Sequence, residues 1–440
     1  MNILSVCEYL KQKLGVNVNG DYYNKISQWA DWYKGYHKPF HSYTDYNGRE
    51  TVQLDRYSLK MAKKICEDWA NMLLNEETMV VVENKEAQSF VDDVFERNDF
   101  FANANTLIEK TFALGTGAVA VRLNNYKIAL EYITADCIIP ISYNNKAITE
   151  VAFVSEHTHK GKKYIYLETH LKNKYGNYVI RNEYLDENFN RVKTDNKTVE
   201  EYDTKSDVPW FVIFKPNITN NIDINSPMGI SVYANSIDVL KGVDLAYDNL
   251  CTDFFLGGKM VLMNESIIAK DQNGTRIVPQ HSKKRLFMSM GDSIIDGKMY
   301  EEYNPQLRVD ENVKGVQSQL NYLSSKCGLG ERYYSFEFEK NLTATEVVYD
   351  NANLFRNVKK HEKLIAQAIK GLIKCVLMLG GFDEKQKISV IFDDSIIEDK
   401  SKIRAEDRLD MQSGIMKKWE YRMKYYGEHE ELARKMVGSE

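Results

Sequence analysis

The sequence predicts an α+β protein whose first half mixes helices with antiparallel strands and whose second half is mainly helical. Three patterns predict this class. Apolar residues recur at helical spacing over residues 58–76, and they alternate with polar residues in five segments between 117 and 185. Helical spacing then returns over 309–327 and 343–379. All seven Pro lie at or before Pro305, which favours uninterrupted helices in the last third of the chain.

Composition limits the function classes. The 440 residues are 43% hydrophobic and 28% charged, which suits two or three folded units rather than a disordered chain. The formal charge of −5 excludes a strongly basic nucleic-acid binder. Six Cys form no C-x-x-C pair, so we expect reduced thiols in the core. No apolar run approaches the roughly 18 residues that span a bilayer. We therefore expect a soluble protein of a reducing compartment, with no membrane partner.

The first quarter is predicted to be helical. Apolar spacing indicates helices over 20–37, over 58–76 with Ser58 as the N-cap, and over a pair at 85–97 and 100–114. The region between 37 and 48 is expected to be a polar, aromatic loop.

Strands follow. Segments rich in Val, Ile, Tyr and Thr are separated by Asn-Asn and Gly-containing turn signals, which predicts an antiparallel meander. Its strands are expected at 117–123, 127–133, 147–154, 163–171 and 178–185, with one more at 210–214.

A linker from Pro216 to Pro227 precedes the helical half. Ser226-Pro227 is a favourable helix start, and this helix is expected to run to about Leu256. A segment of short strands separates it from a second helix at 309–327. A capping box at 343–346 opens the longest helix, which ends near 379 and is followed by a strand at 388–392 and a charged helical tail.

The two helices that flank the short strands have apolar stripes with few expected neighbours in one chain. We therefore expect these stripes to pack against other copies of the chain. The stripe residues are Tyr233, Ile237, Leu240, Tyr247, Val313, Val316, Leu320 and Leu323.

Motifs for catalysis are weak. The nearest match to a phosphate-binding P-loop, at 291–299, has one residue too many and ends in Met299 where a hydroxyl is needed. His157 and His159 lack a third metal ligand nearby, and exposed strand histidines explain them more simply. The carboxylate pairs at 393–394 and 406–407 would suit Mg²⁺ in a nuclease, but helix caps and surface explain them better. We expect no enzyme, no cofactor and no metal site.

Two regions remain as candidate sites. Segment 257–308 has eight basic against six acidic residues, and its candidate contact residues are Lys259, Lys270, Arg276, Lys283, Lys284 and Arg285. The simpler alternative is a solvated basic turn. The loop at 331–341 mixes basic and aromatic residues between two long helices, and the alternative there is a loop folded onto its own subunit. Its candidates are Glu331, Arg332, Tyr333, Tyr334, Phe336, Lys340 and Asn341.

Several segments, taken in order and spacing, resemble the portal proteins of tailed double-stranded DNA phages, in the branch that infects Gram-positive bacteria. They are SLKMAKKICEDW at 58–69, ITADCIIPI at 133–141, SPMGIS at 226–231, YDNL at 247–250, LSSKCGLG at 323–330, TATEV at 343–347, DDSI at 393–396 and QSGI at 412–415. The resemblance extends over nearly the whole chain.

This resemblance implies a portal fold and a ring, usually of twelve subunits, at one capsid vertex. The implied parts are a wing (1–225), a stem (226–256 and 309–327), a clip (257–308), a tunnel loop (328–342), a long helix (343–380) and a crown (381–440). The clip candidates would contact the terminase motor and a head–tail adaptor, and the loop candidates would line the DNA channel.

The same resemblance implies the partners and the location. The chain would bind copies of itself, the double-stranded DNA that passes during packaging and ejection, and the major capsid and scaffolding proteins. It would assemble in the host cytoplasm and reside in the virion. Two alternatives stay open: another ring-forming head-completion or scaffold component, and a terminase-type packaging enzyme, against which the missing P-loop argues.

Overall fold

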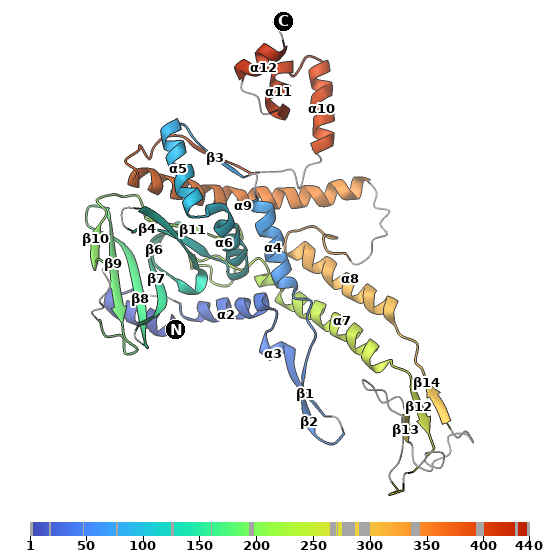
Figure 1. Cartoon of the computed structure of the whole chain (residues 1–440). Coiled ribbons are helices and arrows are strands. Elements are labelled where there is room, and N and C mark those ends of the chain that lie inside the picture. The colour runs from blue at the N-terminus through green and yellow to red at the C-terminus, as the bar shows by residue number, and fades with distance from the viewer. Residues whose placement is uncertain are drawn as a thin grey trace.

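The computed structural model describes residues 3–16, 19–46, 48–75, 78–124, 127–159, 161–192, 198–264, 270, 272–274, 287–289, 300–335, 344–392, 400–426 and 430–437. It is a mixed α and β protein, as the sequence predicts. Figure 1 shows a body of sheets and helices, from which two antiparallel helices project as an arm toward a small sheet. A long helix crosses the body on the side opposite the arm's tip.

Two sheets replace the single meander that we expected. The first has the order β11-β4-β5 and the second has the order β10-β9-β8-β7-β6. The short 3₁₀ turn Ala135–Cys137 separates them, and the late strand β11 returns to pair with β4. The strands are β4 (Gly117–Asn124), β5 (Lys127–Thr134), β6 (Ile138–Asn144), β7 (Ala147–His159), β8 (Lys162–Lys172), β9 (Tyr178–Leu185), β10 (Glu201–Asp203) and β11 (Phe211–Phe214).

Helices and two small two-stranded sheets complete the body. The helices are α1 (Ile3–Leu14), α2 (Asp21–Lys34), α3 (Lys38–His41), α4 (Met61–Leu73), α5 (Lys85–Arg97) and α6 (Phe100–Leu114). The region expected as a loop contains an antiparallel hairpin of β1 (Ser42–Tyr46) and β2 (Thr51–Asp55). A second pair joins β3 (Met79–Val82) to the late strand β15 (Ile388–Ile391).

The remaining elements form the arm, the long helix and the C-terminal region. They are α7 (Ile237–Leu256), β12 (Met260–Met263), β13 (Phe287–Ser289), β14 (Tyr300–Tyr303), α8 (Val309–Lys326), α9 (Ala344–Leu379), α10 (Lys400–Gln412), α11 (Lys418–Tyr426) and α12 (Glu430–Val437). None of the helices in the described ranges is long and apolar enough to cross a bilayer.

Two expected helix starts are wrong. Ser58 does not cap α4, because its hydroxyl accepts from the Lys60 amide (3.0 Å) and donates to Asp244 of α7 (2.9 Å). Ser226-Pro227 does not open α7, which begins at Ile237. In both segments tertiary contacts outweigh the local capping signal.

A contact between two glycines explains why the chain ahead of α7 is not helical. Gly115 ends α6 at φ +87°, and a Cβ there would lie 2.4 Å from the carbonyl oxygen of Gly229. A Cβ on Gly229 would lie 2.2 Å from the oxygen of Gly115. The Gly229 amide donates to the buried Thr116 hydroxyl (3.0 Å), and its carbonyl accepts from Tyr22 (2.5 Å). These bonds replace helical ones, so the segment enters the core without helical structure.

The long helix α9 packs on the body through a buried histidine. The His361 ring lies 4.8 Å from the Trp69 ring and 4.9 Å from the Phe112 ring. Its Nδ1 accepts from the Asn217 amide at 3.0 Å. Burial, assisted by the charge of Lys360, lowers the pKa of His361 to about 3, so the imidazole stays neutral at physiological pH.

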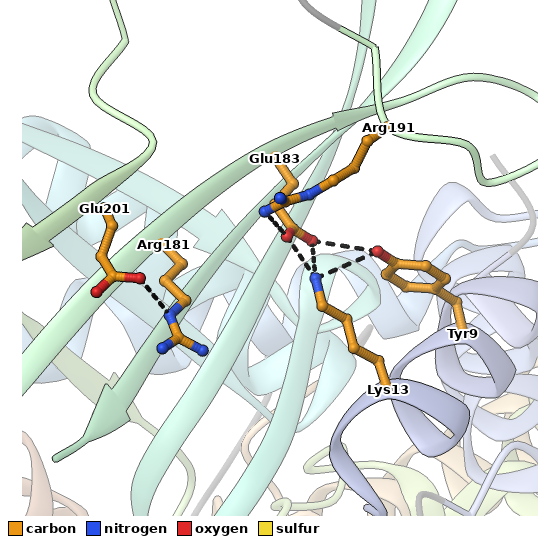
Figure 2. A network of polar contacts seen from close by, with 6 residues as sticks. All are labelled: Tyr9, Lys13, Arg181, Glu183, Arg191 and Glu201. Carbon is orange, nitrogen blue, oxygen red and sulfur yellow. Dashed lines mark hydrogen bonds and ion pairs between the residues drawn. The ribbon is translucent and has the colours of Figure 1, made fainter.

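An ionic cluster ties the N-terminal helix to the larger sheet. Figure 2 shows Lys13 and Tyr9 of α1, together with Arg191, converging on the carboxylate of Glu183 in β9. Burial alone would raise the pKa of Glu183, but the bonds from Lys13 and Arg191 prevail and lower it. The cluster therefore holds α1 against the sheet, while the neighbouring Arg181–Glu201 pair (2.9 Å) joins β9 to β10 at the surface.

Gly115→Ala should destabilise the fold strongly. The new methyl group would clash with backbone atoms of Gly229, which cannot move away as a flexible side chain could. In addition, φ at this position is +87°, a left-handed conformation that alanine disfavours. We expect a loss of about 3 kcal/mol in the free energy of unfolding. Gly161→Ala is the matched control, because Gly161 has φ +76° and no atom within 4 Å of its Cβ position; it should cost about 1 kcal/mol. Equal losses in urea unfolding would contradict the proposed role of the contact.

Acidification should destabilise the protein through His361. The pKa of His361 is lower in the folded state than its unfolded value of about 6.5. The stabilisation that comes from keeping this imidazole neutral is therefore complete above pH 6.5 and is lost as the pH falls toward 3. At pH 5 the loss from this group is about 2 kcal/mol. His361→Asn keeps an acceptor for Asn217 but cannot titrate. Its stability should fall less than that of the wild type between pH 7.5 and pH 5 in denaturant titrations, and an unchanged slope would contradict this account.

Candidate functional site

The most distinctive feature is the arm of α7 and α8. The two helices lie antiparallel and approach closely at Gly242, where a Cβ would lie 2.6 Å from the Gln319 side-chain oxygen. The strand-forming segment between them returns to the arm, with β12 paired to β14 and to β13. The chain therefore leaves the body along one helix, forms a small sheet and comes back along the other.

The arm covers its own apolar stripe, which corrects our expectation about that stripe. Five stripe residues are buried within the single chain: Tyr233, Leu240, Val316, Leu320 and Leu323. Ile237, Tyr247 and Val313 are half-buried. The five buried side chains are removed from water within the single chain, without help from another copy. The large apolar side chains that the arm leaves exposed are a different set: Leu245, Phe254, Phe255, Leu256 and Tyr322.

A buried carboxylate fixes the base of the arm. Asp244 lies on the inner face of α7 and is almost fully buried. It accepts from the Ser58 hydroxyl (2.9 Å) and from the Leu59 amide (2.9 Å), and it lies 3.1 Å from Nε2 of the buried His41. Our reading of the sequence missed this residue. A lone Asp between Val243 and Tyr247, on the apolar face of a helix, is the signal that could have found it.

The tip of the arm is also fixed by a carboxylate. Asp253, in the last turn of α7, accepts from the Arg308 guanidinium (2.9 Å) and from the Asn312 amide (3.0 Å). The bond from Arg308 lowers the pKa of Asp253. The start of α8 is thereby tied to the end of α7, and the small sheet begins at a defined point.

The small sheet presents few of the basic candidates among its described residues. Lys259 forms an ion pair with Glu302 of β14 (2.8 Å), and Lys270 is exposed. All four residues of β14 are exposed, and they comprise two Tyr and two Glu. Arg276, Lys283, Lys284 and Arg285 lie outside the described residues.

The chain after α8 is anchored to the body before it reaches the candidate loop. Gly328 adopts φ +84°, and its carbonyl accepts from Asn357 of α9 (2.9 Å). The Trp69 indole of α4 donates to the Cys327 carbonyl (3.2 Å). The turn is thus held between α4 and α9.

Tyr334, one of the loop candidates, is hydrogen-bonded to its own chain. Its hydroxyl donates to the buried Asp68 of α4 (2.8 Å), and its carbonyl accepts from Gln317 of α8 (2.9 Å). For this residue the alternative of a loop folded onto its own subunit holds. Glu331, Arg332 and Tyr333 are exposed, while Phe336, Lys340 and Asn341 lie outside the described residues.

Another buried carboxylate, Glu168, joins the two main sheets. Glu168, between the two main sheets, accepts from Arg122 (2.8 Å) and Tyr166 (3.1 Å) and lies 2.8 Å from Nε2 of His170. Burial would raise the pKa of Glu168, but the bonds from His170 and Arg122 lower it. The carboxylate is therefore fully engaged by its neighbours. Over the described ranges, no group of three or more His, Cys, Asp or Glu could hold a metal ion.

Asp244→Asn should weaken the base of the arm. The amide has only one acceptor oxygen and brings two donors toward the Ser58 and Leu59 donors, so we expect a loss on the order of 3 kcal/mol in unfolding free energy. Asp238→Asn is the control on the same helix, since Asp238 is exposed and pairs only with Lys241 in the described contacts; it should be nearly neutral. Denaturant unfolding measures both, and a neutral Asp244→Asn would refute the anchoring role.

The sequence matches a family of known proteins. The family described as phage portal protein, SPP1 Gp6-like, matches residues 17–406 of the chain, from the segment before α2 to the middle of α10. No curated protein matches the sequence.

Proposed function

Because the chain belongs to the SPP1 Gp6-like family of phage portal proteins, we propose that it forms a ring at one vertex of a phage capsid and that DNA enters and leaves through the central channel. The family is a structural one. Portal rings usually have twelve subunits, and we propose the same number for this chain.

The observation that supports this proposal best is the arm with its small sheet. A pair of helices that projects from a body and ends in a sheet suits a stem that forms the channel wall and a clip that meets other proteins. We assign the wing to 1–225, the stem to 226–256 and 309–327, the clip to 257–308, the tunnel loop to 328–342, the long helix to 343–380 and the crown to 381–440.

The burial pattern of the arm refines the contact between copies. Most of the stripe residues are already buried within the chain. We therefore assign the ring contact of the stem to the exposed residues of the arm, which are Leu245, Phe254, Phe255, Leu256 and Tyr322. An exposed apolar surface of this kind on a helical arm is typical of a protein interface.

The roles at the two ends follow. At the clip, Lys259, Lys270, Arg276, Lys283, Lys284 and Arg285 are assigned to the contacts with terminase and the head–tail adaptor. At the tunnel loop, the residues assigned to the channel wall are Glu331, Arg332, Tyr333, Phe336, Lys340 and Asn341. Tyr334 forms the fixed base of this loop. Major capsid and scaffolding proteins would surround the wing.

The net negative charge of the chain is consistent with a channel that binds DNA weakly and lets it move, rather than with a site that binds DNA tightly. Each phosphate contact made by Lys or Arg adds to a salt-sensitive hold on DNA. A subunit with a formal charge of −5 makes such a hold weak, so that the duplex can slide. With no P-loop in the sequence, the energy of packaging would come from a separate motor protein.

The purified full-length chain should form rings with a central hole in negative-stain electron microscopy. Native mass spectrometry should give a single dominant oligomer near twelve subunits, and the rings should not hydrolyse ATP. A chain that stays monomeric at high concentration would overturn the ring. ATP hydrolysis by the isolated protein would overturn the division of labour with a separate motor.

A further inference from the structure

The two-stranded sheet of β3 and β15 has an exposed apolar face. The antiparallel register places Met79 opposite Ile391 and Val81 opposite Ser389. Because side chains alternate along a strand, Met79, Val81 and Ile391 share one face. They are 57%, 46% and 47% exposed. The other face, with Val82 and Ile388, is buried toward α5 and α9.

The outer edge of β3 is closed by a side chain. The Gln88 amide of α5 accepts from the Val82 N–H (2.6 Å) and donates to the Val80 carbonyl (3.1 Å), as a neighbouring strand would. Asn98 closes the edge of β5 in the same way, through Leu130 (3.0 Å) and Ile128 (3.2 Å). Such capping blocks the addition of another strand. The edge of β3 is therefore unavailable for pairing, whereas its apolar face is exposed and could be covered by an apolar surface.

The C-terminal helices also leave large apolar side chains exposed. Leu409 of α10, Ile415 after it and Met436 of α12 are each more than half exposed. Among the described elements, α10, α11 and α12 pack mainly against one another. A unit of this size buries too little apolar surface to be stable alone. It therefore needs a partner surface.

We infer that the face formed by Met79, Val81 and Ile391 receives the helices α10–α12 of a second copy. Both surfaces stay exposed in the single chain, so the chain's own helices do not cover the face. Two different apolar surfaces on one chain suit a head-to-tail contact, in which each copy gives one surface and receives on the other. Repetition of such a contact by rotation closes a ring. The inference rests on the proposed function and adds a contact outside the arm.

A charge on the face tests the contact. Val81→Glu should leave the subunit folded, with unchanged circular dichroism, and should raise the concentration at which half of the chains are assembled at least tenfold. Val199→Glu is the matched control, because Val199 is 58% exposed in another part of the body; it should assemble like the wild type. Sedimentation velocity measures both. Wild-type assembly by folded Val81→Glu would overturn the inference while leaving the ring in place. A wild-type chain without oligomers would instead overturn the proposed function.

Disulfide trapping identifies the occupant. In a background in which the half-buried Cys137 and Cys251 are changed to Ala, chains with Val81→Cys are mixed with chains with Leu409→Cys and oxidised. We expect linked pairs in this mixture and none when Val199→Cys replaces Val81→Cys. No linked pair in the mixture, together with a link within one chain when both Cys are on the same molecule, would show that the chain covers its own face and would overturn the inference.

Discussion

The position of the arm depends on one buried carboxylate. Asp244 sits where α7 leaves the body, and a carboxylate removed from water costs several kcal/mol unless its oxygens are fully hydrogen-bonded. Its partners come from the end of α3, through His41, and from the residues before α4, through Ser58 and Leu59. Satisfying this group brings three segments together. The β1–β2 hairpin, the start of α4 and the direction of the arm are therefore set by a common contact.

Much of the fold could be predicted from apolar spacing. The expected helices at 85–97, 100–114, 309–327 and 343–379 match α5, α6, α8 and α9 to within a residue. Their spacing is unbroken, and strong stop signals follow them. The errors occur where distant contacts decide. The contact of Gly115 with Gly229 prevents a helix from starting at Ser226, and the return of β11 to β4 divides the expected meander. Neither partner is adjacent in sequence.

The sequence predicts where the arm and the following loop lie in the chain, but it does not predict which of their side chains are buried. The sequence located the arm and the loop after it, because helices, glycines and short strands follow in a recognisable order. It did not show what covers each apolar stripe, since a stripe at helical spacing has the same pattern whether it faces its own chain or another. The burial of Leu320 and Leu323 against the rest of the chain, and the bond of Tyr334 to Asp68, are properties of the three-dimensional structure.

The cross-link at the tip of the arm has a mechanical consequence. Asp253 joins the end of α7 to Arg308 and Asn312 at the start of α8, while Asp244 joins α7 to the body. A torque applied to the small sheet is therefore shared by both helices and travels along their length, instead of peeling one helix from the other. Since α8 leads into the turn at Gly328, which α4 and α9 hold, we expect a load on the outer end of the arm to be transmitted to these two helices.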